Sequence, residues 1–160
     1  MATRLSFGKS LLILLAMLVL YGTWDIAKTL YWKSRVTAMC LEDGGNTVLE
    51  KVVVPKEEYE RFSTNGGNFN VPWDADRGFE EHPYKYRAED ILIRSGSPAV
   101  TKTVSTTYRV VDGKVLGIDT TYNMYSASMF SFLTAFRFSC GDIPGQEPVS
   151  VSTEIFSKGE

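Results

Sequence analysis

The sequence has few of the residues on which catalytic and metal sites depend. Among its 160 residues there are one histidine, His82, and two cysteines, Cys40 and Cys140. It contains no G-x-S-x-G, H-E-x-x-H, P-loop or G-x-G-x-x-G motif. One histidine and two cysteines complete a four-coordinate zinc site only with help from carboxylates. We therefore expect a protein that is not an enzyme and that holds no cofactor.

The sequence also lacks a cluster of basic residues in its main part. Residues 1–38 hold five basic residues and one acidic residue, a net charge of +4, whereas the rest of the chain holds 12 basic and 18 acidic residues, a net charge of −6. Proteins that bind nucleic acid gather Lys and Arg along a phosphate-binding surface. Nucleic acid is therefore not an expected partner. The basic residues near the N-terminus are better explained as the flanks of a membrane segment.

The strongest feature that is present is a long apolar run near the N-terminus. Leu11–Trp24 contains no charged residue. As a helix it would span about 21 Å, a little less than a hydrocarbon core of ~30 Å. Apolar residues continue beyond Asp25 and Lys28, and the aromatic residues there are typical of a bilayer interface. We predict a basic flank over 1–9 and a transmembrane anchor over 10–32, with the helix continuing to about residue 41.

Three other interpretations of this run are less favoured. A cleaved signal peptide needs small residues at −3 and −1, and the site at Asp25-Ile26-Ala27 has a charge at −3. A lipoprotein needs a small residue before its cysteine, but Met39 precedes Cys40 and lies far from the apolar run. A core helix of a soluble protein would keep a polar face, which this run lacks. An uncleaved single-pass anchor is the favoured interpretation.

The remainder, residues 45–160, is predicted to be a small, mainly antiparallel β domain with short helices, so that the whole chain belongs to the α+β class. The segments rich in β-branched and aromatic residues predict strands, and Pro55 followed by acidic residues predicts a short helix with Pro55 at its first position. Glycine, proline, Asn and Asp predict a long loop. The expected strands are Thr47–Val54, Tyr84–Arg94, 103–111, 114–124 and Val149–Phe156, and the loop is Ser63–Pro83.

Two glycine-containing turns punctuate this domain. Asp112-Gly113 lies between two β-branched runs and predicts a two-residue hairpin turn. Asp43-Gly44-Gly45 either ends the preceding helix, with a glycine in the left-handed conformation, or forms a second hairpin turn. For the aromatic run Met129–Phe138 the spacing fits both a helix and a strand.

An acidic loop is the richest group of polar residues in the chain. Calcium binds to oxygen ligands at alternate positions of such loops, but the EF-hand pattern fails because Phe79 replaces the required glycine and Lys85 replaces the closing acid. We expect no metal here, and a catalytic carboxylate pair is the rival interpretation. The residues are Asp74, Asp76, Glu80, Glu81 and His82.

Four aromatic residues are candidates for contact with a partner. Trp73 and Phe79 lie in the long loop, and Phe130 and Phe132 lie in the aromatic run. The competing interpretation is that all four belong to the hydrophobic core.

The two cysteines leave two alternatives open. In an oxidising compartment they would pair and close a loop of about a hundred residues, which is worth roughly 4–5 kcal/mol in the chain-entropy model. In a reducing compartment they would be a buried pair of thiols.

The segment Cys40–Glu60 resembles small, uncharacterised proteobacterial proteins that carry a membrane or signal segment, a C-x-x-D-G-G motif, a short strand and a proline-led acidic helix. The later segments "ILIR", "YRVVDGKVLG" and "FRFSC" are also similar to theirs. The resemblance implies an exported two-cysteine domain in a Gram-negative bacterium, and it favours a disulfide between Cys40 and Cys140. It implies no activity.

Together these features predict a single-pass protein of the bacterial inner membrane with its C-terminal domain in the periplasm. We expect a non-enzymatic accessory or interaction subunit whose partners are the lipid bilayer and a membrane protein. Three alternatives stay open: an envelope sensor of a small molecule or ion, an envelope enzyme that uses the loop Asp74–His82, and a phage or plasmid exclusion factor.

Overall fold

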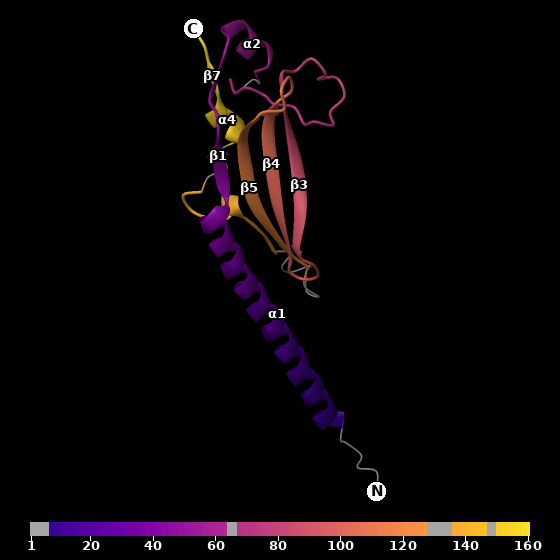
Figure 1. Ribbon diagram of the computed structural model, residues 1–160. Coiled ribbons are helices and arrows are strands. Elements are labelled where there is room, and N and C mark those ends of the chain that lie inside the picture. The colour runs from indigo at the N-terminus through magenta and orange to yellow at the C-terminus, as the bar shows by residue number, and fades with distance from the viewer. Residues whose placement is uncertain (1–6, 64–66, 128–135, 147–149) are drawn as a thin grey trace.

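The protein consists of one long helix followed by an antiparallel sheet with short helices, which confirms the predicted α+β class (Figure 1). This computed structural model describes residues 7–63, 67–127, 136–146 and 150–160. The N-terminal part of the helix extends well beyond the sheet, and the C-terminus lies at the opposite end of the molecule (Figure 1).

Helix α1, Phe7–Asp43, is continuous from the apolar run into the β domain. In the part of the chain that the structure describes, it is the one helix whose length and composition would allow it to cross a bilayer. Its large apolar residues from Leu11 to Trp24 are exposed, whereas Val36 and Cys40 are completely buried against the sheet. The predicted continuation of the helix beyond residue 32 is confirmed.

Among the residues that the structure describes, the main sheet has five antiparallel strands. Its order is β1-β5-β4-β3, and β6 pairs with the end of β5 on the same side as β1. Strand β3 therefore forms an edge of this sheet. The strands are β1 (Gly45–Val48), β3 (Tyr84–Arg94), β4 (Ala99–Arg109), β5 (Val115–Ser126) and β6 (Phe136–Ser139).

Smaller elements close the domain at the end remote from the N-terminus of α1 (Figure 1). A second sheet pairs strands β2 and β7 in parallel. Pro55 is the N-cap of α2 rather than its first helical residue. These elements are β2 (Val52–Val54), α2 (Lys56–Arg61), the 3-10 helix η1 (Cys140–Asp142), which lies nearer α1, α4 (Val151–Ile155) and β7 (Phe156–Lys158).

The prediction of a single strand over Thr47–Val54 is wrong. The backbone N–H groups of Leu49 and Glu50 both donate to the Leu116 carbonyl oxygen, at 2.8 and 3.0 Å. Two consecutive donors on one acceptor break the regular ladder, and the chain leaves the main sheet there. Strand propensity could not reveal that the two halves pair with different strands.

The prediction of a final strand over Val149–Phe156 is also wrong, because Val151–Ile155 is helical. Val151 and Ile155 are four residues apart, so one helical turn places both on the same face. Both are buried, and both pack over Gly117, where an added Cβ would lie 2.7 Å from Ile155 Cδ1. Tertiary packing therefore overrides the β-branched composition of this segment.

The predicted β4–β5 hairpin is present, but its connection is longer than two residues. The strands end at Arg109 and resume at Val115. The Gly113 N–H donates to the Arg109 carbonyl at 2.9 Å, and Gly113 has a φ of +68°, which favours glycine. Val111, predicted to lie in the strand, is instead an exposed residue of the turn.

Two hydrophobic clusters lie on opposite faces of the main sheet. Tyr122 and Met124 of β5 face α1, together with Val36, Cys40 and Phe138. Gly117 is an odd number of residues away and faces α4, because strand side chains alternate. A register shift next to Leu116 lets this side chain join the second cluster, which also holds Val54, Phe69, Val71, Val151, Ile155 and Phe156.

Candidate interaction site at the helix–sheet junction

The segment Cys40–Gly45 joins the long helix to the sheet. Cys40 forms a disulfide with Cys140, with a Cα–Cα distance of 5.4 Å, and both residues are buried. Cys140 follows β6 directly and accepts a hydrogen bond from the Tyr122 N–H at 3.2 Å. The disulfide therefore fixes the last turn of α1 covalently to the face of β5 and β6.

Asp43, the last residue of α1, makes a second connection to the sheet. Lys102 Nζ on β4 lies 2.8 Å from Asp43 Oδ2, and the Tyr122 hydroxyl on β5 donates to both carboxylate oxygens at 2.7 and 2.9 Å. The hydrogen bond from Lys102, followed by that from Tyr122, lowers the pKa of Asp43. A carboxylate at a helix C-terminus is unfavourable by itself, so these donors offset the interaction with the helix dipole.

The two glycines of this segment have different structural roles. The Gly44 N–H donates to the Cys40 carbonyl at 3.1 Å and closes the helix, and a Cβ on Gly44 would lie 2.5 Å from that carbonyl oxygen. Gly45 has a φ of +104° and begins β1. Of the two interpretations of Asp43-Gly44-Gly45, the helix end is therefore confirmed and the hairpin turn is wrong.

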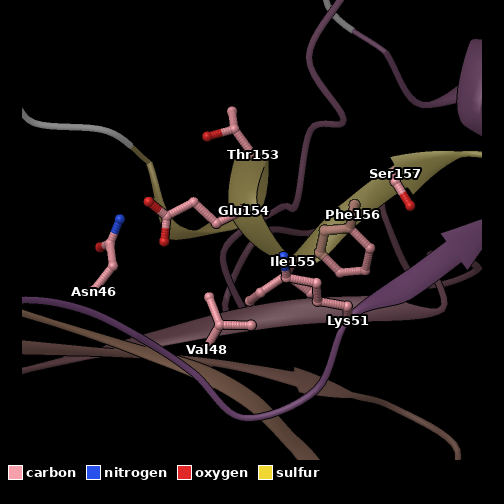
Figure 2. Close-up of a pocket in the computed structure, with 8 residues that line it drawn as sticks. All are labelled: Asn46, Val48, Lys51, Thr153, Glu154, Ile155, Phe156 and Ser157. Atoms are coloured by element: carbon pink, nitrogen blue, oxygen red, sulfur yellow. The ribbon is translucent and has the colours of Figure 1, made fainter.

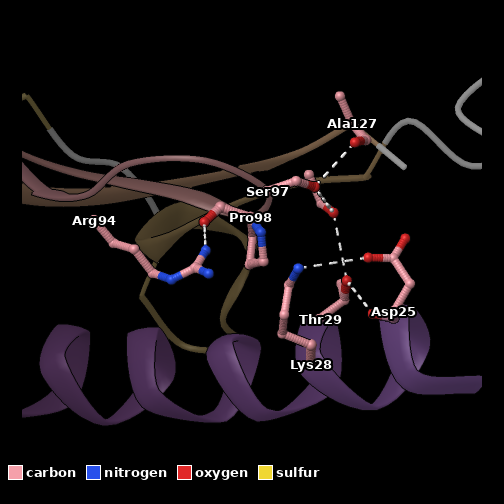
Figure 3. Close-up of polar contacts among 8 residues, drawn as sticks. Asp25, Lys28, Thr29, Arg94, Ser97, Pro98 and Ala127 are labelled. Carbon is pink, nitrogen blue, oxygen red and sulfur yellow. Dashed lines mark hydrogen bonds and ion pairs between the residues drawn. The ribbon is translucent and has the colours of Figure 1, made fainter. Parts of the chain in front are cut away.

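The tip of the sheet touches α1 a second time, further toward its N-terminus (Figure 3). Ser126 Oγ lies 3.4 Å from Thr29 Oγ1 and 3.3 Å from Ser97 Oγ. The Arg94 guanidinium lies over the Trp32 ring, 5.0 Å from its centroid. Helix α1 is thus held at two heights, so its direction relative to the sheet is fixed.

The acidic loop does not form one site. Asp74 accepts two hydrogen bonds from Arg87, at 3.0 and 2.8 Å. This contact is the main reason why the pKa of Asp74 is lowered. Glu81 pairs with Arg61 on α2 at 3.3 Å. In the described part of the chain no group of three or more His, Cys, Asp or Glu side chains is placed to hold a metal ion. Glu80, Glu81 and His82 line one open surface hollow beside Arg61, whereas Asp74 and Asp76 are not among its lining residues.

His82 is a core residue. It is 2% exposed, and its ring lies 4.2 Å from the Phe62 ring and 5.5 Å from the Phe69 ring, measured between centroids. His82 Nδ1 lies 2.6 Å from the Tyr84 carbonyl oxygen and 3.2 Å from the Tyr84 backbone nitrogen. Burial lowers the pKa of His82, so the ring is neutral at pH 7.

The structure describes two of the four aromatic residues that are candidates for contact with a partner. Trp73 and Phe79 are 46% and 43% exposed. They lie in the loop at the end of the sheet remote from the apolar half of α1 (Figure 1). Phe130 and Phe132 lie outside the described residues.

A surface groove lies between α4, β1 and the start of β7 (Figure 2). Its two charged side chains, Lys51 and Glu154, lie at separate places in it rather than converging (Figure 2). The groove is on the surface and is not an apolar pocket inside the sheet. Its lining residues are Asn46, Val48, Lys51, Thr153, Glu154, Ile155, Phe156 and Ser157.

The clamp formed by Asp43, Lys102 and Tyr122 was missed by sequence reasoning, which treated Asp43 as a turn residue. Lys102 and Tyr122 are cross-strand partners. The only signal that could have revealed the clamp is this register, and the imperfect alternation of the hairpin does not define it.

A scan against family models, a search of curated proteins and a search of solved structures each returned no significant match. The resemblance to exported proteobacterial proteins stays a prediction.

Proposed function

We propose that this protein is a non-enzymatic, single-pass accessory or interaction protein of the bacterial inner membrane, with its β domain in the periplasm. The observation that carries the proposal is the construction of α1. Its first half exposes a continuous apolar surface, and its second half is fixed to the sheet by a disulfide and by the Asp43 clamp. An anchor of this kind holds the domain at a defined height and orientation above a bilayer.

The disulfide supports the periplasmic side, because a disulfide persists in an oxidising compartment, whereas the cytosol keeps thiols reduced. Arg4 and Lys9 precede the apolar run and favour a cytoplasmic N-terminus, but Lys28, Lys33 and Arg35 follow the run and weaken this positive-inside argument. The partner would contact the remote end of the domain, where Trp73 and Phe79 are exposed.

Reporter fusions at the C-terminus test the location. Alkaline phosphatase, which needs an oxidising compartment, should be active when fused after Glu160, whereas β-galactosidase fused there should be inactive. The reverse pattern would contradict the periplasmic orientation. The intact mass of the membrane-extracted protein should include the apolar segment, and a mature chain that begins near Lys28 would contradict the anchor.

Extraction in a mild detergent with a C-terminal tag tests the accessory role. We expect a stoichiometric membrane protein to copurify and to be lost from a Trp73→Ala/Phe79→Ala variant. Leu49→Ala is the matched control, because Leu49 is a large apolar residue that is also exposed, at 58%, but lies outside this loop. If the protein is recovered alone at native expression, the accessory role is wrong.

A further inference from the structure

The edge strand β3 changes character at the end that lies nearest α1. Its residues from Arg87 to Asp90 are polar or small, but the next three, Ile91, Leu92 and Ile93, are aliphatic and are 42%, 63% and 45% exposed. Tyr125, at the same end of β5, is 55% exposed. The core does not explain these side chains, because they point into solvent.

The exposed aliphatic residues are not confined to one face of the sheet. Ile91 is the cross-strand partner of Lys102, and Leu92 is the partner of Thr101, so the two point to opposite faces. A flat protein partner would cover one face. A strand added to this edge would also have to accommodate Glu89 and Asp90, charges that discourage pairing. A lipid environment, which can surround both faces of the strand end, fits this pattern better.

The exposed surface of α1 indicates where the bilayer ends. The charge-free run reaches only Trp24 and is about 9 Å too short for a hydrocarbon core of ~30 Å. The missing length is supplied on the side of the helix that faces away from the sheet, because Ile26, Leu30 and Tyr31 are each about 60% exposed. With these residues in lipid, the hydrocarbon boundary lies near Tyr31.

The opposite side of the same helical turns is polar and is covered by the tip of the sheet. The Asp25 and Lys28 side chains form an ion pair at 3.7 Å and are only 17% and 30% exposed (Figure 3). Ser97 and Ser126 lie beside Thr29. Arg94, the residue that follows Ile93, lies over the ring of Trp32, one residue beyond Tyr31, so the end of β3 is at the level of the lipid headgroups.

We propose that the end of β3 (Ile91–Ile93), together with Tyr125, is a second membrane contact that inserts into the headgroup layer of the bilayer. This inference rests on the proposed anchor and adds to it. The domain then lies against the membrane surface, and its tip shields Asp25 and Lys28 from lipid. Aliphatic side chains and tyrosine are suited to this layer, where apolar and polar groups meet.

Depth-dependent fluorescence quenching tests the contact in the full-length protein. Single cysteines replace Leu92, Leu20 or Val111 and carry the fluorophore NBD, and the native disulfide stays intact. The protein is reconstituted in vesicles of phosphatidylethanolamine and phosphatidylglycerol with a nitroxide either at the headgroup or in the middle of the acyl chain. Val111 is the matched control, since it is apolar and exposed but lies at the remote end of the sheet.

We expect the label at Leu92 to be quenched several-fold more by the headgroup nitroxide than by the mid-chain nitroxide. The label at Leu20 should show the reverse, and the label at Val111 should be quenched by neither. If Leu92 behaves like Val111 while Leu20 is quenched, the second contact is wrong and the anchor stands. If Leu20 is not quenched, the anchor itself is wrong. A label at Leu92 that is shifted to the blue but not quenched means that protein covers the site, and this also overturns the inference.

Discussion

The two halves of α1 are one continuous helix, yet they depend on different surroundings. From Leu11 to Trp24 the helix exposes large apolar residues on all sides, whereas beyond Asp25 it has one buried face that includes Val36 and Cys40. Helical hydrogen bonds satisfy the backbone in both halves, so only the side chains distinguish them. The first half therefore has the composition of a membrane span, whereas the second half has the surface of a helix that packs against protein.

Removal of the disulfide should cause the largest change in stability. It should affect the β domain and the half of α1 that packs on it, but not the first half of α1. The closed loop has a sequence separation of 100 residues, and its loss should lower the free energy of unfolding by about 4 kcal/mol. Urea unfolding of a Cys40→Ala/Cys140→Ala variant in detergent, followed by the strand signal in circular dichroism, measures this. Reductant should destabilise the native protein equally and leave the variant unchanged. Equal urea midpoints for the variant and for the native protein without reductant would contradict the prediction.

The same substitution in each half gives the sharpest test of the comparison. Val36 is completely buried, whereas Val19 is 63% exposed. Val36→Ala should lower the unfolding free energy of the domain by about 2 kcal/mol, because it removes buried methyl groups and leaves a cavity. Val19→Ala should change it by less than about 0.5 kcal/mol. Similar losses in chemical unfolding would mean that both halves pack against protein.

The smallest expected effect concerns the Asp43 clamp. Because Asp43 is about half exposed, its coupling to Lys102 should be about 0.5 kcal/mol. A double-mutant cycle with Asp43→Asn and Lys102→Met measures this value, and a coupling of zero would mean that the ion pair contributes nothing.

The pH dependence of the clamp has a definite sign. The pKa of Asp43 is lower in the folded protein than its ordinary value of 3.8, so the clamp is fully stabilising above that value. Its contribution is lost as the pH falls through the folded pKa. The native protein should therefore be more stable than Asp43→Asn at neutral pH, and this difference in stability should shrink below pH 3.8. Melting temperatures of both proteins at several pH values would show this.

The sequence was most informative where a pattern is long and local. The charge-free run defined α1, the β-branched runs defined β3, β4 and β5, and the glycines defined the end of the helix. These features depend on the residues within each segment.

Prediction failed where distant residues decide the structure. Val151–Ile155 has a strand-like composition but is helical, because its two apolar residues pack over Gly117. The junction of Asp43 with Lys102 and Tyr122 depends on register, and the exposure of Trp73 depends on how the long loop folds. His82, one of the five residues of the acidic loop, is a core residue because Phe62 and Phe69 pack against it.

The disulfide also makes most of the domain a covalent ring. The chain from Cys40 to Cys140 passes through all five strands of the main sheet before it closes on itself. A protease that cuts once in the exposed loop around Phe79 would open this ring without releasing a fragment. The two pieces would stay linked through the disulfide and would separate on a gel only after reduction. The sheet therefore stays covalently attached to α1 even when its backbone has been cleaved.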